Sequence, residues 1–175
     1  MKILKLLSLA AMVVFFVSCS KDDDDDNNTE NISADIVGTW TATDVDYYGT
    51  TTTSANGITT EADFTGEGYD INFTLTFTEN PNEITSVGSY SILLTTTFNG
   101  QNIEQNVEDL TWDSTGDWSI DGTTLTTNTS GNVGVSEIQE LTQNSLILYI
   151  ENTEEITANG VTSTSTQFLT AKFTR

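Results

Sequence analysis

Apolar and polar residues alternate along most of the chain beyond residue 38. Phe73, Leu75 and Phe77 alternate with asparagine and threonine, and Trp118 stands between polar residues. The last stretch, Thr166–Phe173, alternates in the same way. Successive side chains of a β-strand point to opposite faces, so a period of two predicts strands with one buried face.

Tight turns separate these stretches. Asn-Gly and Asp-Gly favour two-residue hairpin turns because both central residues of such a turn take positive φ. The dipeptides are Asn56-Gly57, Asn99-Gly100, Asp121-Gly122 and Asn159-Gly160. Further turns are expected at Asn80-Pro81-Asn82, Ser130-Gly131-Asn132 and Gln143-Asn144. The pattern predicts eight to ten strands with short links, preceded by one helical turn near Ser33–Val37 with Ser33 as N-cap.

Consecutive antiparallel strands with short links form a meander, and closing the meander into a barrel removes its exposed edges. We therefore predict an all-β fold, an antiparallel up-and-down barrel over residues 35–175. A two-sheet sandwich has the same periodicity and is the structural alternative. Leu146–Ile150 is apolar on both faces, which indicates a central strand or a contact outside the barrel wall.

The first 34 residues have a different character. Lys2 and Lys5 precede the apolar run Leu6–Val17, which is the length of an export signal and short for a membrane span. The residues before Cys19 resemble the lipobox of bacterial lipoproteins, although Phe16 replaces the usual leucine. The resemblance implies cleavage after residue 18 and acylation of Cys19, which would anchor the chain to a membrane. The alternative is an ordinary signal peptide with an incidental cysteine.

Ser20, Lys21, Asp22 and Asp23, followed by three more aspartates, resemble the surface-export signal of lipoproteins of the Bacteroidota. That resemblance implies display on the outer face of the outer membrane. A plain solvated tether is the alternative, because like charges repel and keep a chain extended. We expect residues 19–34 to form this acidic tether and residues 1–18 to be removed.

Gly38-Thr39-Trp40 opens the first expected strand of the barrel and resembles the Gly-x-Trp signature of lipocalins. The family places a basic residue near the end of its last strand, packed over that tryptophan at the closed end. Arg175 is the candidate here, with Lys172 second. The mature chain as a whole resembles lipocalin-like lipoproteins of the Bacteroidota. The resemblance implies an eight-stranded barrel in which Trp40 and Arg175 form a structural pair.

One feature of the first strand departs from that pattern. A strict period of two from Trp40 would turn Asp44 and Asp46 into the barrel, where unpaired carboxylates are costly. We therefore predict a β-bulge that switches the faces and turns Val45 and Tyr47 inward.

Charge and composition narrow the function. The chain has 5 basic and 26 acidic residues, a net charge of −21. Loss of Lys2 and Lys5 with the signal would leave three basic residues and a charge of −23, which makes nucleic acid an improbable partner. The chain has no histidine and one cysteine, in the export segment, so no catalytic Ser-His or Cys-His pair can form. No motif indicates an enzyme, a metal site or a cofactor.

Two classes of function remain. In the first, the barrel holds a small apolar or amphipathic molecule, as the lipocalin resemblance implies. Its walls would be the inward residues Phe73, Leu75, Phe77 and Trp118, with Tyr47 at the mouth. In the second, those side chains fill the barrel and the protein is a non-enzymatic interaction module on the cell surface, with a partner that the sequence does not identify. Eight-stranded barrels of both kinds exist.

One modification is also open. Asp113-Ser114-Thr115 resembles the acceptor for O-glycosylation in the Bacteroidota, with Ser114 as the residue modified.

Overall fold

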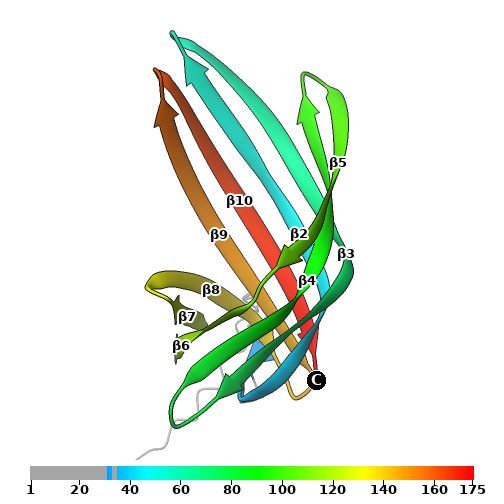
Figure 1. The fold of residues 1–175 in the computed structure, drawn as a ribbon, viewed down its shortest axis with the longest axis vertical. Helices are drawn as coiled ribbons and strands as arrows, with labels where there is room; N and C mark the ends of the chain where they lie inside the picture. The colour runs from blue at the N-terminus through cyan, green and yellow to red at the C-terminus, as the bar shows by residue number, and fades with distance from the viewer. Residues whose placement is uncertain (1–30, 33–34) are drawn as a thin grey trace, which may run out of the picture.

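The computed structural model describes residues 31–32 and 35–175, and that part of the chain contains ten strands and no helix (Figure 1). The strands are β1 (Asn31–Ile32), β2 (Gly38–Ala55), β3 (Ile58–Thr78), β4 (Glu83–Phe98), β5 (Gln101–Thr111), β6 (Ser114–Asp121), β7 (Thr124–Thr129), β8 (Asn132–Leu141), β9 (Ser145–Ala158) and β10 (Val161–Thr174). Strands β2 to β10 form a single antiparallel sheet that closes in a ring. The predicted fold class, an all-β antiparallel barrel, is confirmed.

Neighbours in the ring are neighbours in sequence, with one exception at β4. Its first part, Glu83–Ser86, pairs with β6, whereas Ser89–Phe98 pair with β5. The path that closes the ring is therefore β2-β3-β4-β6-β7-β8-β9-β10, and β5 branches from it. Every pairing in this path lies within residues 38–174, so the barrel is complete without the first thirty residues.

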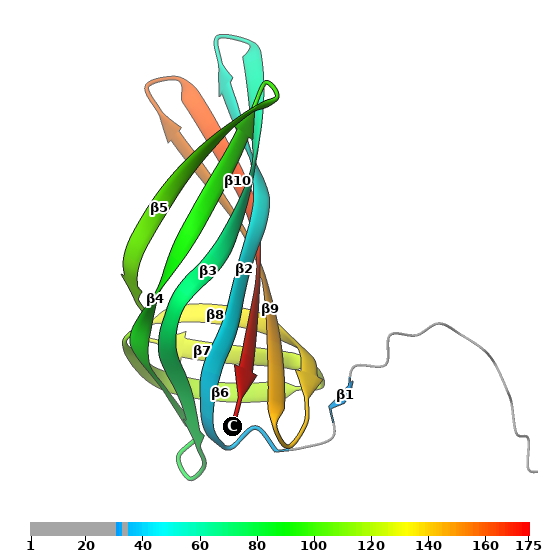
Figure 2. The same ribbon diagram turned by 90° about the vertical axis from the view of Figure 1, so that its right-hand side faces the viewer.

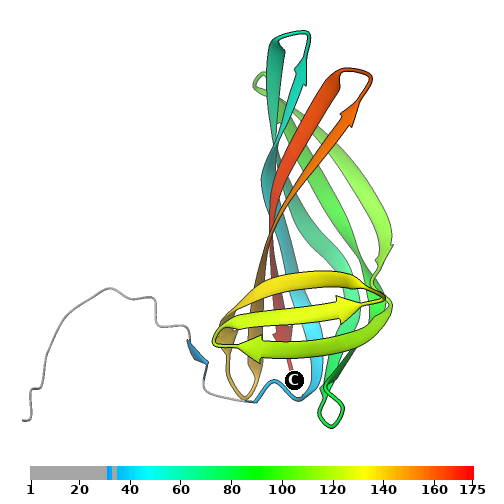
Figure 3. The ribbon, with the colours of Figure 1, turned by 90° about the vertical axis from the view of Figure 1, so that its left-hand side faces the viewer.

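The branch divides the molecule into two levels. Strands β6, β7 and β8 lie across the long axis near one end and complete a closed base there (Figures 2 and 3). The remaining strands continue past them as an open, curved sheet of six strands. This upper sheet consists of β5 with residues 47–55 of β2, 58–66 of β3, 90–98 of β4, 150–158 of β9 and 161–169 of β10.

The hydrophobic core lies in the closed base. The largest fully buried side chains are Trp40, Phe73, Phe77, Phe173, Leu125, Ile138, Leu146 and Val45. The rings of Phe73 and Phe173 meet edge to face with 5.6 Å between their centroids. Such contacts between rings add to the free energy gained from burial, so the base is packed with side chains.

The predicted bulge in the first strand is confirmed. Pairing of β2 with β3 is interrupted between Thr41 and Asp46, and its pairing with β10 shifts beside Thr43. The hydroxyl of Thr43 donates to the backbone carbonyl of Lys172 across the irregularity. The faces switch there, so that Val45 is buried and Asp46 is not turned into the core.

The predicted helical turn at Ser33–Val37 is wrong for its described residues, 35–37. The carboxylate of Asp35 accepts a hydrogen bond from the backbone N–H of Val37 at 2.9 Å, which forms a local turn. Arg175 donates to the carbonyls of Asp35 and Val37, at 3.1 and 2.9 Å. The segment is thus held by the residue that follows the last strand rather than by helical hydrogen bonds. Ser33, the expected N-cap, lies outside the described residues.

The stretch Leu146–Ile150 is central, as expected. It pairs with β8 on one side and with β10 on the other. Leu146 and Leu148 are buried in the core.

Candidate functional site

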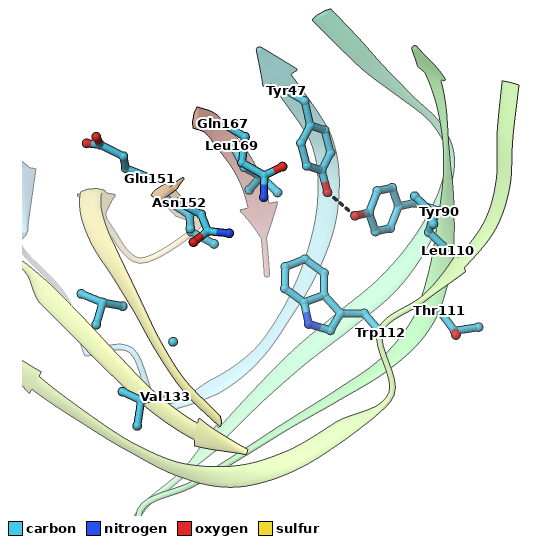
Figure 4. A pocket seen from close by; sticks show the side chains of 13 residues that line it. Tyr47, Tyr90, Leu110, Thr111, Trp112, Val133, Glu151, Asn152, Gln167 and Leu169 are labelled. Atoms are coloured by element: carbon cyan, nitrogen blue, oxygen red, sulfur yellow. Dashed lines mark hydrogen bonds between the residues drawn. The ribbon is translucent and has the colours of Figure 1, made fainter. Parts of the chain in front are cut away.

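A cavity of about 680 Å³ lies above the packed base, where the ring opens into the upper sheet (Figure 4). This volume is within the range of small-molecule sites in proteins. Tyr47 of β2, Tyr90 of β4 and Trp112, which follows β5, form its aromatic wall. Leu169 and Ile150 add apolar surface from β10 and β9.

The aromatic wall is held by contacts between its own members. The rings of Tyr47 and Tyr90 are nearly parallel, with centroids 6.5 Å apart, and their hydroxyl groups share a hydrogen bond. The ring centroid of Phe73 lies 5.5 Å from that of Tyr90 and 5.5 Å from that of Trp112. Burial raises the pKa of Tyr47 well above its ordinary value, and the hydrogen bond to Tyr90 raises it further. Both phenols are therefore neutral at physiological pH.

Trp112 is positioned by the crossing from β5 to β6. Its backbone N–H donates to the carbonyl of Gly88 at 3.0 Å, and its own carbonyl accepts from the hydroxyl of Ser86. The carboxylate of Asp113 accepts from the N–H of Gly88 at 2.9 Å. Gly88 has φ of +118° and lies against the backbone of β3, which leaves no room for a Cβ atom. β4 changes its pairing partner at this position, from β6 before Gly88 to β5 after it.

The cavity opens sideways between β8 and β9. Residues Glu137–Leu141 of β8 pair with β9. The preceding residues of β8, Asn132–Ser136, pair with β7 alone within the described chain, so the two strands are separate there. Val133, Gly134 and Val135 line the cavity from one side of the gap. On the other side, residues 150–152 of β9 line it.

The wall that faces the aromatic side chains is polar near the opening. Gln167 and Asn152 occupy paired positions on β10 and β9, and both line the cavity. Asn152 donates from its amide to the carboxylate of Glu154, at 3.3 Å. A row of polar groups thus leads from the cavity towards the open end of the upper sheet.

Further hollows lie near the cavity. One of about 500 Å³ lies along the concave face of the upper sheet and shares Tyr47 and Gln167 with the cavity. Beyond it, near the hairpin tips, Ile58, Ile103 and Ile156 share that face and are 64–69% exposed. A smaller hollow of about 90 Å³ lies within the base.

The candidate ligand residues proposed from the sequence occupy different places. Tyr47 lines the cavity, whereas Phe73 and Phe77 are buried in the base. Leu75 lines the 90 Å³ hollow within the base. Trp118 packs edge to face on Phe77 with centroids 5.7 Å apart, and its indole N–H donates to the carbonyl of Thr78 at 3.0 Å. The structure therefore brings one of the five residues to the cavity.

Sequence reasoning missed Tyr90 and Trp112, the other two members of the aromatic wall. A usable signal exists: Tyr90 alternates with the inward residues Ile92 and Leu94, and Trp112 alternates with Leu110. Tyrosine and tryptophan rings carry a polar group as well as apolar area, which suits the boundary between a packed core and a polar opening.

The structure brings Trp40 and Arg175 together at the closed base. The guanidinium carbon lies 4.2 Å from the centroid of the indole, and the indole N–H donates to the carbonyl of Ile36 at 2.8 Å. Arg175 also donates to the carbonyl of Gln143 at 2.7 Å. Lys172, the second candidate, instead forms an ion pair with Asp44 at 2.6 Å.

Ser114, the predicted glycosylation site, lies on β6 with its side chain towards the interior of the barrel. Its hydroxyl shares a hydrogen bond of 2.8 Å with that of Ser86, and it lines the 90 Å³ hollow.

The predicted acylation site, Cys19, lies outside the described residues, as does the predicted surface-export signal, Ser20, Lys21, Asp22 and Asp23. Within residues 31–32 and 35–175, no three histidine, cysteine, aspartate or glutamate side chains are grouped so as to hold a metal ion. The same residues include no helix that could cross a membrane.

Fold and cavity together define an antiparallel barrel with a packed base and a laterally open cavity. No protein-family model, curated protein or solved structure matches this chain.

Proposed function

We propose that this protein is a lipid-anchored surface protein whose lipocalin-like barrel binds a small apolar or amphipathic molecule. The observation that carries the proposal is the cavity of about 680 Å³ between a packed base and an open upper sheet. Its aromatic wall offers apolar area, and its polar side supplies hydrogen-bonding groups to orient a ligand. The lateral gap between β8 and β9 gives a route of entry.

A fluorescent apolar dye such as Nile red tests the binding. Residues 20–175 contain the complete barrel and avoid the need for detergent. Val135 lines the cavity and is 55% exposed; Val87 does not line it and is 56% exposed. Val135→Asp should weaken dye binding about fivefold or more through lost apolar contact, and Val87→Asp should not. Failure of the dye to saturate, or equal losses in both variants, would refute the proposal.

The anchoring part of the proposal rests on the lipobox-like residues before Cys19. Intact mass spectrometry of protein extracted from its host membrane tests it. The expected species lacks residues 1–18 and carries acyl chains on Cys19. Protease accessibility on intact cells then tests display on the outer surface.

A non-enzymatic interaction module is the second candidate, and the exposed isoleucines of the concave face favour it. Exposed apolar surface of this kind often marks a contact site. Ile58→Ser and Ile156→Ser should leave dye binding unchanged and abolish capture of a protein partner. If the same variants weaken dye binding, those isoleucines belong to the ligand site.

A further inference from the structure

Glu154 projects from the concave face of the upper sheet. It pairs across β9 and β10 with Ser165, and Ser165 pairs with Thr51 of β2. Thr51 lines the 500 Å³ hollow, and its hydroxyl shares a hydrogen bond of 3.1 Å with that of Ser165. Paired residues of neighbouring strands share a face, so Glu154 faces the same hollow side of the sheet.

The strand register assigns the other carboxylates of the upper sheet to the convex face. Glu155 is opposite Thr164, which donates to its carboxylate at 3.4 Å. Glu151 is opposite Phe168 by register and also contributes to the lining of the 680 Å³ cavity. The remaining ones on that face are Glu61, Asp63 and Glu104, with Asp46 and Glu67 just below the upper sheet. Apart from the irregular residues 108–109, Glu154 is the one carboxylate that the strand register assigns to the concave side of the described upper sheet.

Positive charge is found elsewhere. The two basic side chains of the described residues, Lys172 and Arg175, both lie in the closed base. Lys172 is paired with Asp44 there, and Arg175 with Trp40. The concave face therefore carries a carboxylate and, within the described chain, no cation to neutralise it.

Glu154 stands at the outer end of the polar row. Asn152 lines the cavity and lies two residues before Glu154, which is a distance of about 7 Å along a strand. A molecule with its apolar part against Tyr47 and Trp112 can thus extend past Asn152 to the carboxylate. The surrounding charge of the protein attracts a cation and repels an anion at this position.

We propose that the ligand is an amphiphile with a cationic head of the ammonium class. Its apolar chain occupies the cavity and its head pairs with the carboxylate of Glu154. The faces of the tyrosine and tryptophan rings add attraction for a cation that passes them. This inference rests on the proposed binding function and adds the chemical class of the ligand.

Three probes with ten carbons, decylammonium, decanol and decanoate, test the class of the head. Each competes with Nile red for residues 20–175 at neutral pH and low ionic strength. Decylammonium should compete at the lowest concentration and decanoate at the highest. Glu154→Gln should lower the affinity for decylammonium about two- to fivefold and leave the affinity for decanol unchanged.

Glu155→Gln is the matched control, because it removes the same charge from the adjacent residue on the opposite face. It should leave the affinity for decylammonium near the wild-type value. Equal competition by decylammonium and decanoate, or equal effects of the two glutamine variants, would overturn the cationic class while apolar binding stands. Absence of saturable binding by Nile red and by all three probes would refute the binding function itself.

Discussion

Replacement of Arg175 by alanine should destabilise the barrel more than its position at the end of the chain suggests. The side chain lies over Trp40 and donates hydrogen bonds to three backbone carbonyls, those of Asp35, Val37 and Gln143. The cation–π contact contributes about 0.5–1 kcal/mol at an exposed site. Each of the three hydrogen bonds contributes a net value of roughly 0.5 kcal/mol or more. The free energy of unfolding should therefore fall by about 2–3 kcal/mol in total.

Urea unfolding followed by circular dichroism measures this loss in residues 20–175. Lys172→Ala is the control, because it removes the same charge three residues earlier in the chain but breaks only the exposed ion pair with Asp44. That variant should cost less than about 1 kcal/mol. Arg175→Lys keeps the charge without the planar fork of donors, so its cost should lie between those of the two alanine variants.

Two results would refute this reasoning. Equal losses for Arg175→Ala and Lys172→Ala would mean that the contacts at the closed base add nothing beyond charge. Wild-type stability of Arg175→Lys would mean that the fork geometry is unimportant.

Three other predictions follow from the core and the cavity. Trp40→Ala should lower the free energy of unfolding by about 3–5 kcal/mol in urea titrations, because it removes a fully buried ring; no loss of stability would contradict its structural role. Gly57→Ala should lower the free energy of unfolding by about 1 kcal/mol, because alanine is strained at the φ of +78°. Gly88→Ala should lower it by about 3 kcal/mol or more, since the new Cβ would lie 2.1 Å from a backbone oxygen. Similar losses in the two variants would contradict this reasoning. The raised pKa values of Tyr47 and Tyr90 mean that the folded state holds these protons more tightly, so their contribution to stability is complete below pH about 10 and falls as pH rises above it. Near-ultraviolet absorbance should show these two phenols ionising only above the ordinary range, and ionisation of all five tyrosines near pH 10 in the folded protein would contradict the burial.

Local signals in the sequence predict much of the fold. The Asn-Gly turns at residues 56, 99 and 159 close the three long hairpins, with positive φ at each asparagine. The cost of burying Asp44 and Asp46 predicts the bulge, because a strict alternation would place both inside. These features depend on neighbouring residues and on a period of two, both of which are visible in one sequence.

The cavity depends on features that local periodicity does not contain. Phe73 and Phe77 have the same inward pattern as Tyr47, but they lie in the closed base while Tyr47 lies at its upper limit. Their roles differ because β4 exchanges β6 for β5 at Gly88, which ends the closed ring. Alternation assigns a side chain to a face, but the closure of the ring decides whether that face is filled.

The entry of the chain at the closed base has a consequence for orientation. Gly38 begins β2 beside Arg175, while the tips of the three long hairpins lie at the opposite end (Figure 2). A strand of 21 residues, such as β3, spans roughly 70 Å. A chain held from its N-terminal side would therefore present its hairpin tips outermost, with the lateral gap part of the way up. Incoming molecules would then meet the three hairpin tips of the upper sheet before they reach the closed base (Figure 2).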